Sequence, residues 1–165
     1  MKNGNVILIG MPASGKSTVG VILAKVLGMN FIDTDIVIQH REGTKLNLII
    51  DKKGIDAFMK CEEEAILATN VSNTVISTGG SAVYSAAAME HLKRDAVVVY
   101  LKVGLRELKR RLGNFKERGI VIKPGETLEG MYKARSVLYE KYADITVGEN
   151  GASIEDTVTE IKRRL

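Results

Sequence analysis

Residues 6–17 read Val-Ile-Leu-Ile-Gly-Met-Pro-Ala-Ser-Gly-Lys-Ser. The first four are apolar, and such a continuous run is typical of a strand buried on both faces of a parallel sheet. Apolar residues at helical spacing then follow from residue 16 to residue 27, where Gly28 ends the pattern. The stretch between them, Gly10-x-x-x-x-Gly15-Lys16-Ser17, has the spacing of a phosphate-binding loop in the strand–loop–helix context that this motif requires.

Each residue type in this loop suits the binding of ATP with Mg²⁺. The glycines let the backbone N–H groups turn toward phosphate oxygens, and the helix N-terminus adds partial positive charge. The lysine places a cation near the β- and γ-phosphates, and the serine hydroxyl can ligate Mg²⁺. The residues that we expect to bind ATP here are Gly10, Ala13, Ser14, Gly15, Lys16, Ser17 and Thr18. The sequence lacks the N-K-x-D motif usual in GTPases and is short for a motor ATPase, so a small-molecule or nucleotide kinase is the favoured class.

The rest of the chain alternates between predicted strands and helices. Further strands are expected at residues 31–35, 75–77, 96–101 and 145–147, and helices at 36–70 (broken near Gly43 and Gly54), 86–92, 105–112 and 153–164. This alternation implies right-handed crossover units around a parallel sheet. The length of 165 residues suits one domain, residues 1–165.

Composition narrows the expected partners. The formal charge is +4 and aromatic residues make up 5%, so stacking platforms for nucleic acid are not expected and an anionic small molecule is favoured. The sequence shows no signal peptide and no apolar run long enough to span a membrane. The single cysteine, Cys61, is consistent with a reducing compartment. We expect a cytoplasmic monomer that binds neither membranes nor nucleic acid.

Two further segments predict chemistry. Asp33 and Asp35 alternate at the end of the second predicted strand, so both are expected on one face at the sheet edge that binds ligands. One carboxylate could hold Mg²⁺ through water and the other could accept a hydroxyl proton, although Asp35 could instead cap the next helix. Residues 113–126 are polar and rich in glycine, which indicates a lid over the active site, with Arg118 inside it.

These residues together resemble the shikimate kinase family over nearly the whole chain. The more specific elements are Phe31-Ile-Asp-Thr-Asp35, Gly79-Gly80 and Arg135-Ser-Val-Leu-Tyr139, in that order. The resemblance implies a three-layer α/β sandwich of the P-loop kinase type, with a five-stranded parallel sheet in the order 2-3-1-4-5, a lid at about 113–126 and acceptor-binding helices at about 36–70.

The resemblance also assigns roles to residues. Asp35 would contact the acceptor hydroxyl, and Asp33 would lie near Mg²⁺ through water. Gly79 and Gly80 would turn the backbone against the acceptor, and Arg135 would hold its carboxylate. Arg118 would reach the phosphates and Arg110 would lie against adenine, although Arg110 could equally be a solvated helix end.

The sequence departs from the family at two positions on the acceptor side. The family has Phe-Arg where this chain has Phe58-Met59, and its third glycine is Ser81 here. Lys60 cannot simply replace the arginine, because one helical step rotates a side chain by about 100°. Three functions stay open: phosphorylation of shikimate, phosphorylation of another small hydroxylated acceptor such as a polyol or sugar acid, and regulation by nucleotide binding without transfer.

Overall fold

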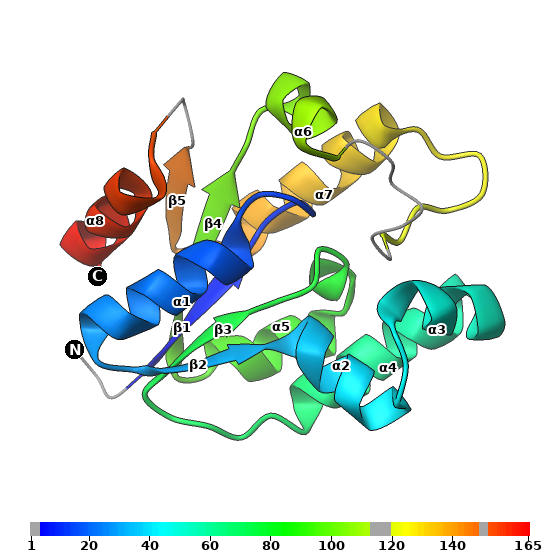
Figure 1. Cartoon of the computed structure of the whole chain (residues 1–165), viewed down its shortest axis with the longest axis horizontal. Coiled ribbons are helices and arrows are strands. Elements are labelled where there is room, and N and C mark those ends of the chain that lie inside the picture. Colours follow the sequence, from blue (N-terminus) through cyan, green and yellow to red (C-terminus); the bar gives the residue numbers. More distant parts are fainter. Residues whose placement is uncertain (1–3, 113–119, 149–151) are drawn as a thin grey trace.

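The computed structural model describes residues 4–112, 120–148 and 152–165. Within these ranges, five strands form one parallel sheet in the order β2-β3-β1-β4-β5, as Figure 1 shows. The strands are β1 (Asn5–Ile9), β2 (Asn30–Asp33), β3 (Thr74–Ser77), β4 (Ala96–Lys102) and β5 (Ile145–Gly148). The predicted fold class and strand order are confirmed.

Helices cover both faces of the sheet because side chains of β1 alternate between two cores. Val6 and Leu8 pack against α1 (Lys16–Leu27) and α8 (Ile154–Arg164). Ile7 and Ile9 face the other core, to which the remaining layer of helices contributes. That layer comprises α5 (Ala86–Lys93), α6 (Leu105–Leu112), α7 (Leu128–Tyr142) and part of α4 (Ile55–Leu67). The result is a three-layer sandwich (Figure 1).

A third apolar cluster lies beside the β2 edge of the sheet. It joins α2 (Thr34–Glu42), α3 (Leu46–Lys53) and α4 through Ile38, Ile49 and Phe58. Val121, from the loop before α7, is also buried in this cluster. The helices expected at 36–70 are therefore present, with breaks at Gly43 and Gly54, and the described end of the predicted lid packs on them.

The boundary after β2 differs from the sequence-based expectation. The strand ends at Asp33 and α2 begins at Thr34, so Asp35 lies in the first helical turn and does not share a strand face with Asp33. Asp33, not Asp35, is the N-cap: its Oδ1 accepts a hydrogen bond of 3.0 Å from the Asp35 N–H. An N-cap carboxylate satisfies a backbone donor that the helix leaves unpaired, which favours starting the helix here.

Candidate active site

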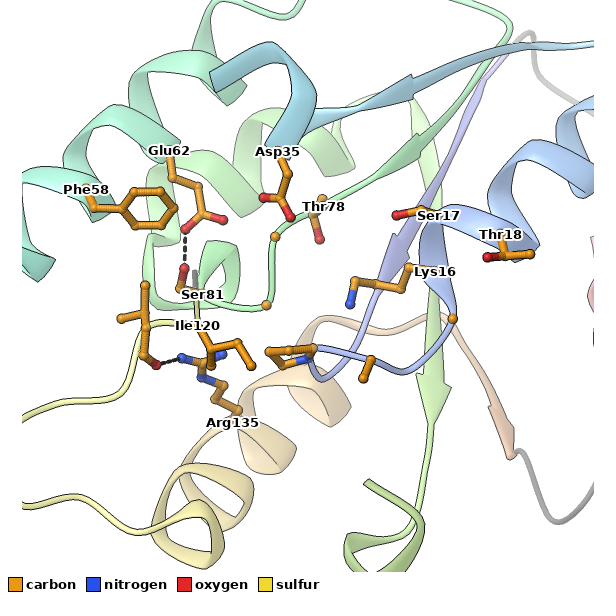
Figure 2. Close-up of a pocket in the computed structure, with 16 residues that line it drawn as sticks. Lys16, Ser17, Thr18, Asp35, Phe58, Glu62, Thr78, Ser81, Ile120 and Arg135 are labelled. Carbon is orange, nitrogen blue, oxygen red and sulfur yellow. Dashed lines mark hydrogen bonds between the residues drawn. The ribbon is translucent and has the colours of Figure 1, made fainter. Parts of the chain in front are cut away.

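A cavity of about 400 Å³ opens between the phosphate loop and the α2–α4 helices (Figure 2). It lies beyond the carboxyl ends of β1 and β3, the edge at which open α/β sheets bind ligands. The residues that line it are Pro12, Ala13, Gly15, Lys16, Ser17, Thr18, Asp35, Phe58, Glu62, Thr78, Gly79, Gly80, Ser81, Ile120, Val121 and Arg135. Most residues predicted from the sequence to bind ATP or the acceptor are therefore brought together.

The phosphate loop depends on backbone conformations that favour glycine. Gly15 has φ +87° and precedes the first turn of α1. Gly10 has φ +150°, and a Cβ there would lie 2.7 Å from the carbonyl oxygen of Leu101. Both glycines are thus required by geometry as well as by the motif. Ser14, also predicted in the ATP set, is fully buried and supports the loop through a 3.1 Å bond from its N–H to the Met11 carbonyl.

Lys16 projects into the cavity from the start of α1 (Figure 2). Its amino group donates to the carbonyl oxygens of Gly10 and Met11, each at 2.8 Å. Burial lowers the pKa of Lys16 to about 8, with a smaller opposing effect from Asp35 and Asp33. The lysine is therefore held at the loop as a cation that phosphate oxygens would stabilise further.

Ser17 and Asp33 form a pair of oxygen ligands beside the lysine. The Ser17 hydroxyl donates to Asp33 Oδ2 at 2.5 Å and lies 3.5 Å from the Ser77 hydroxyl. Mg²⁺ prefers such hard oxygen donors and usually retains several water ligands. The hydroxyl and carboxylate oxygens present here are of the kind that fits Mg²⁺.

Two carboxyl groups of the cavity lining approach Gly79. Asp35 comes from α2 and Glu62 from α4, and both side chains point into the cavity (Figure 2). A Cβ at Gly79 would collide with Glu62 Oε1 and lie 2.9 Å from Asp35 Oδ1. Burial, together with the neighbouring charge of Asp33, raises the pKa of Asp35 to about 6. At neutral pH most of this carboxyl is ionised and able to accept a proton.

Arg135 is a buried cation that lines the cavity. Its side chain is 1% exposed, and its Nη2 donates to the Val121 carbonyl at 2.5 Å. The guanidinium also lies 5.3 Å from the centre of the Tyr84 ring. Among the described residues no carboxylate forms an ion pair with it. A buried guanidinium that contacts neutral groups favours binding of an anionic ligand.

Gly80 and Tyr139 help to position this arginine. A Cβ at Gly80 would lie 2.8 Å from Pro12 Cδ and 2.9 Å from Arg135 Nη1. The Tyr139 hydroxyl donates to the Gly80 carbonyl at 2.6 Å. Glycine is thus the residue that lets the backbone pass between the phosphate loop and the arginine.

Glu62 is a site residue that sequence reasoning missed. It belongs to a run of three glutamates, which resembles a solvated helix face. A usable signal was present, because Phe58, Glu62, Ala65 and Ile66 fall on one helical face and all are buried. A glutamate on an otherwise apolar stripe is a candidate functional residue.

The structure bears differently on three arginines and on Met59. Arg110 is exposed and forms two hydrogen bonds with Glu107, and the adenine contact stays a prediction. The neighbouring Arg111 donates to the Ala13 carbonyl of the phosphate loop at 3.4 Å. Arg118 lies outside the described residues. Met59 is partly buried against the apolar cluster of α2, α3 and α4.

Comparison with known proteins identifies the family of this chain. The sequence model of the shikimate kinase family matches residues 12–165. The shikimate kinase of Pasteurella multocida is 38% identical over 161 residues, which cover 95% of this chain and 92% of that protein. The shikimate kinase of Haemophilus influenzae is 37% identical, with coverage of 95% and 89%.

Solved structures give the same result. The shikimate kinase of Acinetobacter baumannii in complex with shikimate has a TM-score of 0.87 at 30% identity, covering 98% of this chain and 92% of that one. The enzyme of Aquifex aeolicus has a TM-score of 0.83 at 33% identity, with coverage of 96% and 94%. In the described ranges no helix is long and apolar enough to cross a membrane. Since the family model covers most of the sequence and solved shikimate kinases share the fold, this chain belongs to the shikimate kinase family and is an ATP-dependent kinase.

Proposed function

We propose that this protein transfers the γ-phosphoryl group of ATP to the 3-hydroxyl of shikimate, a step of aromatic amino acid biosynthesis. The observation that carries the proposal is that one cavity is lined by Lys16 of the phosphate loop, Asp35 of α2 and the buried Arg135 of α7, whose side chains come from different sides of the opening (Figure 2). This arrangement matches a substrate that carries both a hydroxyl and a carboxylate.

The described residues suggest a separate role for each side chain in phosphoryl transfer. Lys16 would neutralise the β- and γ-phosphates while Arg135 orients the acceptor by its carboxylate. Asp35 would orient the acceptor hydroxyl and take its proton, an effect typically of about 10²- to 10⁴-fold. Ser17 and Asp33 would hold Mg²⁺, which when bound neutralises phosphate charge. Arg118, in the predicted lid, is proposed to reach the transferred phosphoryl group.

A second acceptor class is favoured by one observation. Met59 stands where the family has an arginine, and it packs in an apolar cluster, so Arg135 is the cation that the described residues provide at this end. A polyol or sugar acid would suit a site with a single fixed guanidinium. The reaction is proposed to take place in the cytoplasm, and because one chain lines the cavity, a monomer would suffice.

The test measures ADP release with Mg²⁺-ATP against shikimate and a panel of polyols and sugar acids. We expect kcat/KM for shikimate of about 10⁴ M⁻¹s⁻¹ or more, within the range of ordinary enzymes. The variant Arg135→Met should raise KM for shikimate much more than KM for ATP. Turnover of another acceptor in place of shikimate would establish the second candidate. ATP binding without transfer to any acceptor would indicate the regulatory function instead.

A further inference from the structure

The feature that the mechanism above leaves unused is a hydrogen bond across the acceptor end of the cavity. The Ser81 hydroxyl donates to Glu62 Oε2 at 2.5 Å, drawn as a dashed line in Figure 2. Both residues line the cavity, and both side chains are buried, at 5% and 2% exposed. The bond thus fixes a carboxyl group inside the pocket.

This hydroxyl is not required for the local backbone. Ser81 precedes the short 3₁₀-helix η1 (Ala82–Tyr84), but its side chain makes no capping bond there. Ser85, at the other end of η1, behaves differently: its hydroxyl accepts from the Ala88 N–H at 3.0 Å and caps α5. Ser85 also donates to Glu63, next to Glu62 on α4. One turn therefore carries two serine–glutamate pairs, and the Ser81 pair is the one that lines the cavity.

The second oxygen of Glu62 is available to a ligand. Within the part of the chain that the structure describes, Glu62 Oε1 is buried and has no hydrogen-bond partner. It lies against the Gly79 backbone, where Asp35 also approaches. Buried polar atoms in native proteins are nearly always paired, so an orphaned oxygen in a pocket marks a place that a bound molecule can satisfy.

The charges around Glu62 come from several elements, and none forms an ion pair with it among the described residues. Asp35 on α2 disfavours its ionised form, whereas Lys16 of the phosphate loop and Arg135 on α7 favour it. Glu62 in turn has a small effect on the pKa of Tyr139 on α7. Burial is the largest effect and raises the pKa of Glu62 to about 7, while the Ser81 hydrogen bond opposes that rise.

We propose that Ser81 is a positioning residue for Glu62: its hydroxyl holds the carboxyl so that Oε1 faces the acceptor beside Asp35. Met59 leaves this carboxyl without an arginine neighbour on α4, and a neutral hydroxyl supplies the hydrogen bond instead. The statement that Oε1 faces the acceptor rests on the proposed function. The statement that Ser81 positions the Glu62 carboxyl does not. A serine fits at this position because its backbone has φ −90°, in the ordinary right-handed region.

The first test needs no substrate. The protein is labelled with ¹³C at the glutamate carboxyls, and the Glu62 resonance, assigned with Glu62→Gln, is titrated in wild type and variants. Because a hydrogen bond to a carboxylate favours its ionised form, Ser81→Ala should raise the pKa of Glu62 by about one pH unit. Ser81→Thr keeps the donor and should restore the wild-type titration. Ser85→Ala is the matched control, which should lower thermal stability without moving the Glu62 resonance.

The second test is kinetic. At pH 7 we expect Ser81→Ala to raise KM for the acceptor by about tenfold, with KM for ATP unchanged. In a Glu62→Gln background the same substitution should have no further effect, because the serine acts through Glu62. An unchanged Glu62 titration in Ser81→Ala, or equal losses in both backgrounds, would overturn the proposal. If the titration moves as expected but wild type does not phosphorylate shikimate, the proposed substrate is wrong while the assignment of Ser81 stands.

Discussion

Replacing Glu62 by glutamine should make the free energy of unfolding less dependent on pH. The carboxyl is almost completely buried, and burial raises its pKa from the ordinary 4.5 to about 7. Between these two values the unfolded chain has lost the proton that the folded protein still holds. The folded state therefore binds more protons, and its stability falls as pH rises from about 4.5 to about 7.

The size of the effect follows from the two pKa values. Each pKa unit corresponds to 1.36 kcal/mol, so the penalty approaches roughly 3 kcal/mol above pH 7 and is still small at pH 5. Glutamine cannot ionise and carries no such penalty. The stability of Glu62→Gln relative to wild type should therefore increase by about 2 to 3 kcal/mol between pH 5 and pH 8.

The assay is urea unfolding of both proteins, without nucleotide, at several pH values from 5 to 8. Glu63→Gln, on the same helix, is the matched control for the loss of a neighbouring carboxyl. Parallel stability curves for wild type and Glu62→Gln would refute the reasoning, because they would show that Glu62 titrates normally in the folded protein.

Four further expectations concern the reaction. Lys16→Ala should abolish transfer while the circular dichroism spectrum stays that of the wild type; near-normal turnover would contradict its role. Since the pKa of Lys16 is lowered to about 8 and phosphate should raise it, ATP binding near pH 8 should take up a proton, which calorimetry in buffers of different ionisation enthalpy can measure. Asp35→Asn should reduce kcat by about 100-fold or more with little change in ATP affinity, whereas a loss confined to ATP binding would point to a metal or structural role. Met59→Arg should lower KM for shikimate by about tenfold, and an unchanged value in an already efficient enzyme would show that Met59 matters little.

The fold could be predicted because its signals are local. The phosphate loop fixes the order strand, loop, helix, and the short apolar runs mark the other strands, so the alternation was readable without tertiary information. The boundary after β2 was placed wrongly because the aspartates fit both a strand end and a helix start. The hydrogen bond from the Asp35 N–H to the Asp33 side chain favours the helix start. The spacing of apolar residues does not reveal this bond.

Glu62 was missed for the opposite reason, because its role depends on distant segments. Arg135, on the buried face of α7, is likewise a charged residue whose burial is set by tertiary structure. Glu62 is buried by contacts with Ser81 and Gly79, which are about twenty residues away in the sequence. A buried polar residue is chosen for its partners, and those partners are set by the tertiary structure.

Asp33 divides its two oxygens between the two halves of the active site. Oδ2 accepts from Ser17 at the proposed magnesium site, while Oδ1 caps α2, the helix that carries Asp35. A substitution of Asp33 that alters its contact with Ser17 must therefore also disturb the cap of α2, and the reverse also holds. Natural variation that tunes the acceptor pocket is expected to accumulate elsewhere, at positions such as Met59 and Ser81, because there a side chain can change without moving the phosphate donor.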